Sequence, residues 1–133
     1  MRRVFADAVY WIAFVRPEDP WAGEAERVSR NLEDAHVSTT DEVLTEFLAA
    51  LAAGGEHLWR RAVEMVHGLP ADPDVTALKQ SRRSFLYDKR RDKGYSLVDR
   101  VSTNAMRDAG IREILTNDHH FLQEGFIPLM RSQ

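Results

Sequence analysis

Two carboxylates stand where an apolar strand is expected to end. Asp7 follows the apolar run at residues 4–6, and Asp118 comes shortly after the apolar pair at residues 114–115. In an open parallel α/β sheet, ligands bind outside the carboxyl ends of the strands, so acids at two such ends can converge. Carboxylate oxygens are the ligands that Mg²⁺ and Mn²⁺ prefer. The pair therefore predicts a candidate metal site at one edge of a sheet.

Two further acids fall near the starts of expected helices. No cation lies three or four residues from Glu46, so an ion pair along the helix does not explain this residue. Asp99 likewise has hydroxyls at Ser102 and Thr103 and a tyrosine at position 95 as its helical neighbours. Both acids are therefore candidate metal ligands.

Each position also has a purely structural interpretation, which stays open at this point. Asp7 can cap a helix, and Asp118 can cap a turn. Asp99 lies three residues after Ser96, and Glu42 three residues after Thr39, both as in a capping box. We assign Glu42 to that structural role and keep it as the reserve candidate for a metal ligand. The other four acids together predict a site for phosphoryl transfer, because a bound metal activates water and neutralises phosphate charge.

The expected elements alternate between the two kinds of secondary structure. Hydrophobic periodicity, caps and breakers predict the order β-α-α-β-α-α-α-α-β-β. Strands separated by helices imply a three-layer α/β/α sandwich with a mostly parallel central sheet and right-handed crossovers. The strands are expected at residues 4–6, 36–38, 111–116 and 126–129, and the helices at 8–15, 21–35, 41–53, 56–67, 76–93 and 96–109.

Length and composition limit the class of protein. The 133 residues fit a single domain, 1–133, with an ordinary 44% of hydrophobic and 29% of charged residues. A net charge of -3 argues against a generally basic wrapper of nucleic acid, and the lack of Cys excludes disulfides, thiolate zinc sites and a Cys nucleophile. No signal-peptide pattern or membrane-spanning run is present, so we expect a soluble, cytoplasmic protein without membrane contact.

Four short segments, in order, resemble the motifs of PIN-domain proteins, specifically the VapC-like toxins of bacterial toxin–antitoxin pairs. The resemblance covers nearly the whole chain. It places the family's acids on Asp7, Glu46, Asp99 and Asp118, within the segments at residues 5–13, 39–46, 96–99 and 115–121. The family often has Thr or Ser directly after its first aspartate, where this chain has Ala8.

The resemblance implies a function and partners. It implies a PIN-like fold and a Mg²⁺- or Mn²⁺-dependent endoribonuclease in which these four acids are both the metal ligands and the catalytic residues. It also implies homodimerisation, an RNA substrate and inhibition by a small cognate antitoxin. Because acids must be ionised to bind metal, we expect activity to fall as the pH drops through their pKa range.

Two other functions are compatible with parts of the sequence. A catalytically silent PIN-like module for protein binding is the alternative, and the presence of all four acids argues against it. A phosphoacceptor signalling domain would need a lysine at a late strand end, and residues 111–129 contain none.

Three further features carry open interpretations. Seven of the 18 basic residues lie between Lys79 and Lys93, as either an RNA-binding patch or a solvated helix face. His119 and His120 are adjacent and lack the spacing of a helical metal site, so we expect structural or exposed roles. The aromatic side chains near the first strand serve either the core or a partner contact: Tyr10, Trp11, Phe14 and Trp21.

Overall fold

A single parallel sheet organises the chain. The computed structural model describes residues 1–79 and 97–131. Its five strands pair in the order β3-β2-β1-β4-β5, and every pairing is parallel. All their carboxyl ends therefore meet at one edge, with β1 in the centre. The strands are β1 (Arg2–Ala6), β2 (Ala35–Thr40), β3 (Val75–Leu78), β4 (Glu113–Leu115) and β5 (Ile127–Pro128).

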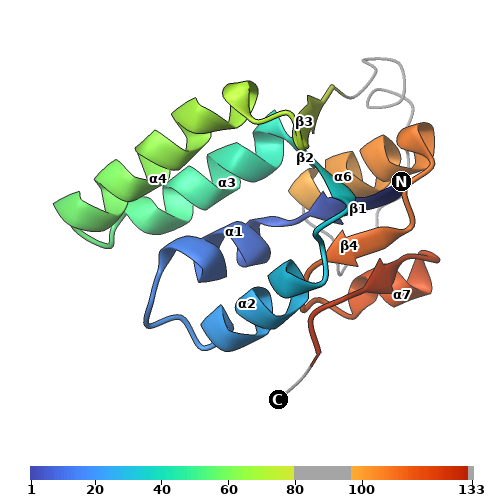
Figure 1. Cartoon of the computed structure of the whole chain (residues 1–133), viewed down its shortest axis with the longest axis horizontal. Coiled ribbons are helices and arrows are strands. Elements are labelled where there is room, and N and C mark those ends of the chain that lie inside the picture. Colours follow the sequence, from blue (N-terminus) through green and yellow to red (C-terminus); the bar gives the residue numbers. More distant parts are fainter. Residues whose placement is uncertain (80–96, 132–133) are drawn as a thin grey trace.

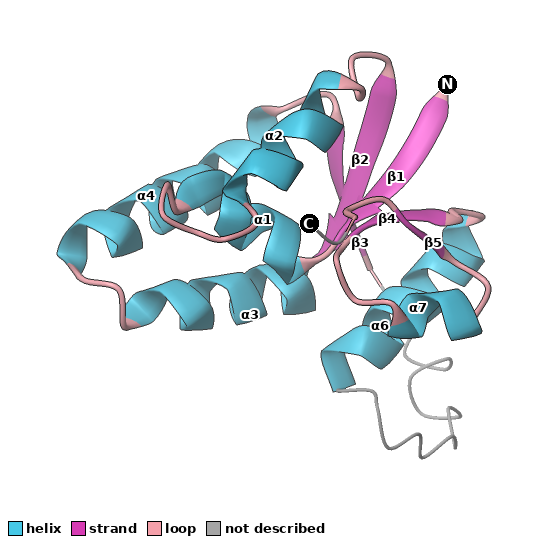
Figure 2. Ribbon diagram, turned by 90° about the horizontal axis from the view of Figure 1, so that it is seen from below, coloured by secondary structure: helices cyan, strands magenta, loops and turns pink. Residues whose placement is uncertain are grey.

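Helices cover the sheet on both sides. Figures 1 and 2 show α1 to α4 gathered on one side of the strands, with α6 and α7 on the other. This arrangement confirms the expected α/β class with a parallel central sheet. The helices are α1 (Ala8–Val15), α2 (Ala22–Arg30), α3 (Asp41–Ala52), α4 (Glu56–Gly68), α6 (Leu97–Ala109) and α7 (His120–Gln123), with a short 3₁₀ turn at Leu69–Ala71.

The core holds the strand ends in place. Val4, Phe5 and Ala6 of β1 are all fully buried, as expected for a central strand that is covered on both faces. On the helical side, Phe47 and Leu51 of α3 are also fully buried. Full burial of such side chains stabilises the fold by about 1.5–3 kcal/mol each, so the position of Asp7 directly after β1 is firmly fixed.

Local capping determines where the helices next to the strand ends begin. Asp7 is the N-cap of α1, and Thr40 is the N-cap of α3, where its Oγ1 accepts a hydrogen bond from the Val43 amide. Because α3 begins at Asp41, Glu42 occupies the second helical position. The capping box predicted between Thr39 and Glu42 is therefore wrong, since the cap is one residue later.

Two predicted elements differ from the structure. The helix expected at residues 76–93 is wrong at its beginning, because Val75–Leu78 forms strand β3. Pairing with the neighbouring strand, with Val37 opposite Val75, outweighs the local helical pattern. The rest of that prediction lies outside the described residues. The helix expected at residues 21–35 ends sooner, at Arg30. Within the described ranges, no helix combines the length and apolarity that crossing a bilayer requires.

Candidate active site at the carboxyl end of the sheet

Asp7 lies at the junction between β1 and α1 and is 7% exposed. One carboxylate oxygen, Oδ1, accepts a hydrogen bond of 2.9 Å from the Ala8 amide, which is the capping bond predicted as its structural role. The other oxygen, Oδ2, accepts a bond of 2.8 Å from the Thr116 hydroxyl. Asp7 is therefore a helix cap that also presents a buried carboxylate at the edge where the strands end.

The buried position changes the ionisation of Asp7. Burial raises the pKa of its carboxyl to about 7, although the hydrogen bonds from Thr116 and Ala8 act to lower it. The charges of Asp99 and Glu46 add to the increase. Such repulsion requires proximity, so the structure brings together three acids that are far apart in the sequence. We call Asp7, Glu46 and Asp99 the acidic cluster.

The other two members of the acidic cluster come from helices that pack against each other. Glu46 lies on α3 and Asp99 on the first turn of α6, and α3 contacts α6. Glu46 is exposed as a residue, yet its pKa is raised, first by loss of hydration and then by the charge of Asp99. Asp99 is half-buried. The cluster thus joins the end of β1 to both helical layers. Ser96, the predicted cap before Asp99, lies outside the described residues.

Asp118 is connected to the site in a different way. Its Oδ1 accepts hydrogen bonds from the His120 amide at 2.9 Å and from His120 Nδ1 at 2.8 Å, as in the predicted turn cap. Its own amide donates to Thr116 Oγ1 at 3.2 Å. Thr116 therefore links Asp118 to Asp7, but Asp118 is not among the charges that raise the pKa of Asp7. Its carboxylate is held by its own turn.

The acidic cluster fits a hard divalent cation in its chemistry. All its donors are carboxylate oxygens, and a bound cation would relieve the repulsion among them. Among residues 1–79 and 97–131, however, no three His, Asp or Glu side chains are grouped tightly enough to hold a metal ion as they stand. A second observation also fits: Ser102, one turn after Asp99, has a buried hydroxyl without a hydrogen-bond partner among those residues.

Two threonines support the site, and the sequence analysis did not select them. Thr116, directly after β4, donates a hydrogen bond from its hydroxyl to Asp7. The residue next to Asp7 in the sequence, Ala8, has no hydroxyl. Thr39 Oγ1 donates to the Ala6 carbonyl at 3.0 Å and accepts from Trp11 Nε1 at 3.3 Å, which braces the end of β1. The sequence feature that could have identified both threonines is a hydroxyl residue at the end of each strand that flanks β1.

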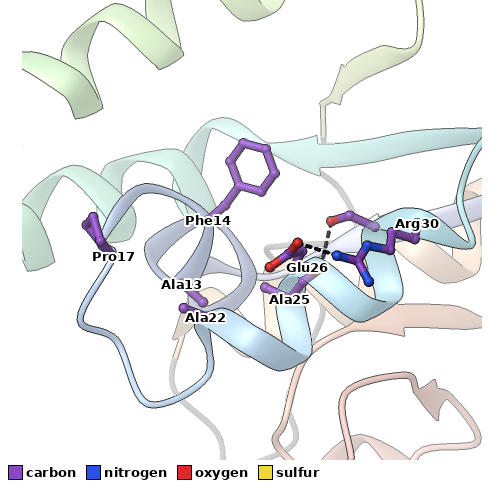
Figure 3. Close-up of a pocket in the computed structure, with 8 residues that line it drawn as sticks. Ala13, Phe14, Pro17, Ala22, Ala25, Glu26 and Arg30 are labelled. Carbon is purple, nitrogen blue, oxygen red and sulfur yellow. Dashed lines mark hydrogen bonds and ion pairs between the residues drawn. The ribbon is translucent and has the colours of Figure 1, made fainter.

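The aromatic residues near β1 divide between core and surface. Tyr10 and Trp11 are buried and Trp21 packs against the core, whereas Phe14 is 58% exposed. Phe14 lines a groove between α1 and α2 (Figure 3). Glu26 and Arg30, which form an ion pair, line the same groove. Of the four aromatics, Phe14 is thus the one available to a partner. The basic segment, interpreted as either an RNA-binding patch or a solvated helix face, lies outside the described residues beyond Lys79.

Comparison with solved structures identifies the fold of the chain. No family model and no curated protein sequence matches the chain. Among solved structures, Mycobacterium tuberculosis VapC20, described as a sarcin-ricin loop cleaving toxin, is similar to it with a TM-score of 0.76. The match covers 93% of this chain and 96% of that one at 24% sequence identity. The chain therefore has the PIN fold of the VapC toxins.

Proposed function

We propose that the chain is a metal-dependent endoribonuclease that hydrolyses RNA phosphodiester bonds, and that it is the toxin of a toxin–antitoxin pair. The observation that carries the proposal is the acidic cluster at the carboxyl end of the sheet, where ligands bind in such folds. The fold shared with VapC20 supports the same function. The catalytically silent alternative explains Asp7 as a helix cap, but it gives no reason for the charges of Glu46 and Asp99 to lie near this carboxylate.

The residues of the site have distinct tasks in this proposal. Asp7, Glu46 and Asp99 would hold Mg²⁺ or Mn²⁺, which when bound supplies Lewis acidity, activation of water and neutralisation of phosphate charge. Asp118 would join them once its carboxylate leaves the turn with His120. Thr116 keeps Asp7 oriented and favours its ionised form, because its hydroxyl donates to Oδ2. No protein nucleophile is needed.

RNA hydrolysis is the direct test of this function. The first substrate to try is an RNA hairpin with the sarcin-ricin loop sequence, because VapC20 is described as cleaving that loop. A hairpin of the same length with a scrambled loop is the matched control. Cleavage that requires Mg²⁺ or Mn²⁺ would support the proposal, and a preference for the first hairpin would identify the substrate. Cleavage of neither hairpin nor of total RNA would contradict it.

The partners follow from the same proposal. We infer a small antitoxin that inserts a cationic segment into the acidic cluster, because opposite charge would relieve the repulsion among its carboxylates. We also infer a homodimer and a cytoplasmic location, where the RNA substrate is found. Light scattering coupled to gel filtration tests the dimer, and a monomer at micromolar concentration would contradict it.

A further inference from the structure

Ser102 has an unexplained hydroxyl. Ser102 is 0% exposed, and its Oγ is the single fully enclosed side-chain N or O atom without a hydrogen-bond partner in the described part of the chain. Nearly all buried polar groups in native proteins have such a partner, because an unsatisfied one costs stability. A physical reason for keeping a hydroxyl at this position is therefore required.

The position of Ser102 connects it with the acidic cluster. It lies three residues after Asp99 on α6, so the two side chains share one face of the helix. Cα–Cβ bonds in a helix tilt toward its N-terminus, and Ser102 therefore leans over the turn that carries Asp99. In addition, α6 packs against α3, which carries Glu46, and against β2, which carries Thr39. The hydroxyl is thus inside the protein, one helical turn from Asp99.

The usual internal partner does not account for Ser102. A serine or threonine within a helix can donate to a carbonyl three or four residues earlier. The adjacent Thr103 does so, with its Oγ1 3.0 Å from the Arg100 carbonyl, and Ser29 on α2 donates to the Ala25 carbonyl at 2.7 Å. Ser102 makes no such bond among the described residues. Its hydrogen-bonding capacity remains available for a ligand.

Resting on the proposed function, we propose that Ser102 is a positioning residue of the acidic cluster. Its hydroxyl makes its hydrogen bond to a water that becomes ordered when Asp7, Glu46 and Asp99 bind a divalent cation. Mg²⁺ usually keeps several waters when it binds to a protein, and groups around a metal site orient its ligands. Such a water would give the hydroxyl the partner that the described residues do not provide.

The test compares Ser102→Ala with Thr103→Val. The first variant removes the unsatisfied hydroxyl, and the second removes a hydroxyl on the same helix that already has a backbone partner. Mn²⁺ affinity is measured by titration, and unfolding by urea is measured in EDTA. We expect Ser102→Ala to be at least as stable as the wild type in EDTA, yet to bind Mn²⁺ about tenfold more weakly. Thr103→Val should bind Mn²⁺ as the wild type does.

Other results would overturn this role for Ser102. Wild-type Mn²⁺ affinity in Ser102→Ala would do so, as would an equal loss in Thr103→Val, which would indicate a general disturbance of α6. Lower stability of Ser102→Ala in EDTA would show a structural bond instead. A wild type that binds no Mn²⁺ overturns this role together with the proposed metal site. If Mn²⁺ binding depends on Ser102 but no RNA is cut, the role of Ser102 holds and the nuclease function fails.

Discussion

Thr116 donates its buried hydroxyl to Asp7, with 2.8 Å between Oγ1 and Oδ2, across 109 positions of the sequence. Thr116 Oγ1 also accepts a hydrogen bond from the Asp118 amide. One hydroxyl therefore connects the two strand ends on which the candidate acids were first identified.

Replacing Thr116 with Val should therefore affect both ionisation and activity. The hydrogen bond from Thr116 lowers the pKa of Asp7, so its loss raises that pKa further. We predict that the acidic limb of the pH–activity profile moves to higher pH and that stability falls by about 2 kcal/mol. Thr116→Ser should restore both. An unshifted acidic limb in Thr116→Val would show that the bond does not tune Asp7.

Asp7 should make stability depend on pH in the absence of metal. Its pKa is raised from 3.8 to about 7 on folding, so the folded protein holds a proton that the unfolded chain has lost. Stability from this group is therefore highest at low pH and decreases by about 1.4 kcal/mol per pH unit until about pH 7. Asp7→Asn removes this dependence. Urea unfolding in EDTA measures the stability of both proteins. The stability of Asp7→Asn relative to that of the wild type should be greater at pH 8 than at pH 5. An equal difference between the two proteins at both pH values would contradict the raised pKa of Asp7.

RNA cleavage should also depend on the ionisation of Asp7, but it should decrease at low pH, where stability is highest. Metal binding requires the ionised carboxylate, and the pKa values of Asp7 and Glu46 are both raised. We predict that RNA cleavage falls as the pH drops below about 7, which is well above the usual range for carboxylates. Rates measured from pH 4 to pH 9 at constant ionic strength test this. A flat profile between pH 7 and pH 4 would contradict it.

Glu46 and Glu42 form a matched pair on α3. Both are exposed and lie four residues apart, and the pKa of Glu46 is raised by loss of hydration and by the charge of Asp99. Glu46→Gln should reduce Mn²⁺ affinity and RNA cleavage by at least about tenfold, whereas Glu42→Gln should change neither. Thermal unfolding of both variants verifies that they are folded. Equal effects of the two substitutions would remove Glu46 from the site.

The C-terminal segment should depend on a buried acid away from the active site. Glu24 is 8% exposed and accepts hydrogen bonds from Arg27 and from the Arg131 amide, while Arg27 also donates to the Leu129 carbonyl. Glu24→Gln should lower stability by about 2 kcal/mol, because it removes the charge that these donors share. The exposed Glu26, paired with Arg30, is the control. Glu26→Gln should change stability by less than about 0.5 kcal/mol, and an equal loss in both variants would contradict the difference in burial.

Sequence patterns predicted the elements whose signals are local. Apolar stripes and caps located α1, α3, α4 and α6, and the strand before Asp7 was recognised from its continuous apolar run. By contrast, β3 is an edge strand with two exposed residues, Thr76 and Ala77, and lacks a strong buried face. Its pairing with β2 is a long-range effect that a local pattern does not contain.

The sequence also predicted only part of the candidate site. The coupling among Asp7, Glu46 and Asp99 includes three of the four acids in the expected ligand set, and the role of all four as ligands stays a prediction. The attachment of Asp118 to His120 depends on the geometry of one turn. The contribution of Thr116 depends on β4 pairing with β1, and the sequence did not determine the strand order. Contacts that require the order of strands are thus the part that sequence reasoning missed.

The most direct measurement of the central claim is RNA cleavage by the purified protein with Mg²⁺, Mn²⁺ or EDTA, beside Asp7→Asn and Asp99→Asn. Glu42→Gln, prepared in parallel, controls for contaminating nuclease. We predict metal-dependent cleavage by the wild type and by Glu42→Gln, and its loss in both aspartate variants and in EDTA. Equal cleavage by all four proteins, or cleavage that persists in EDTA, would contradict a metal-dependent nuclease site at the acidic cluster.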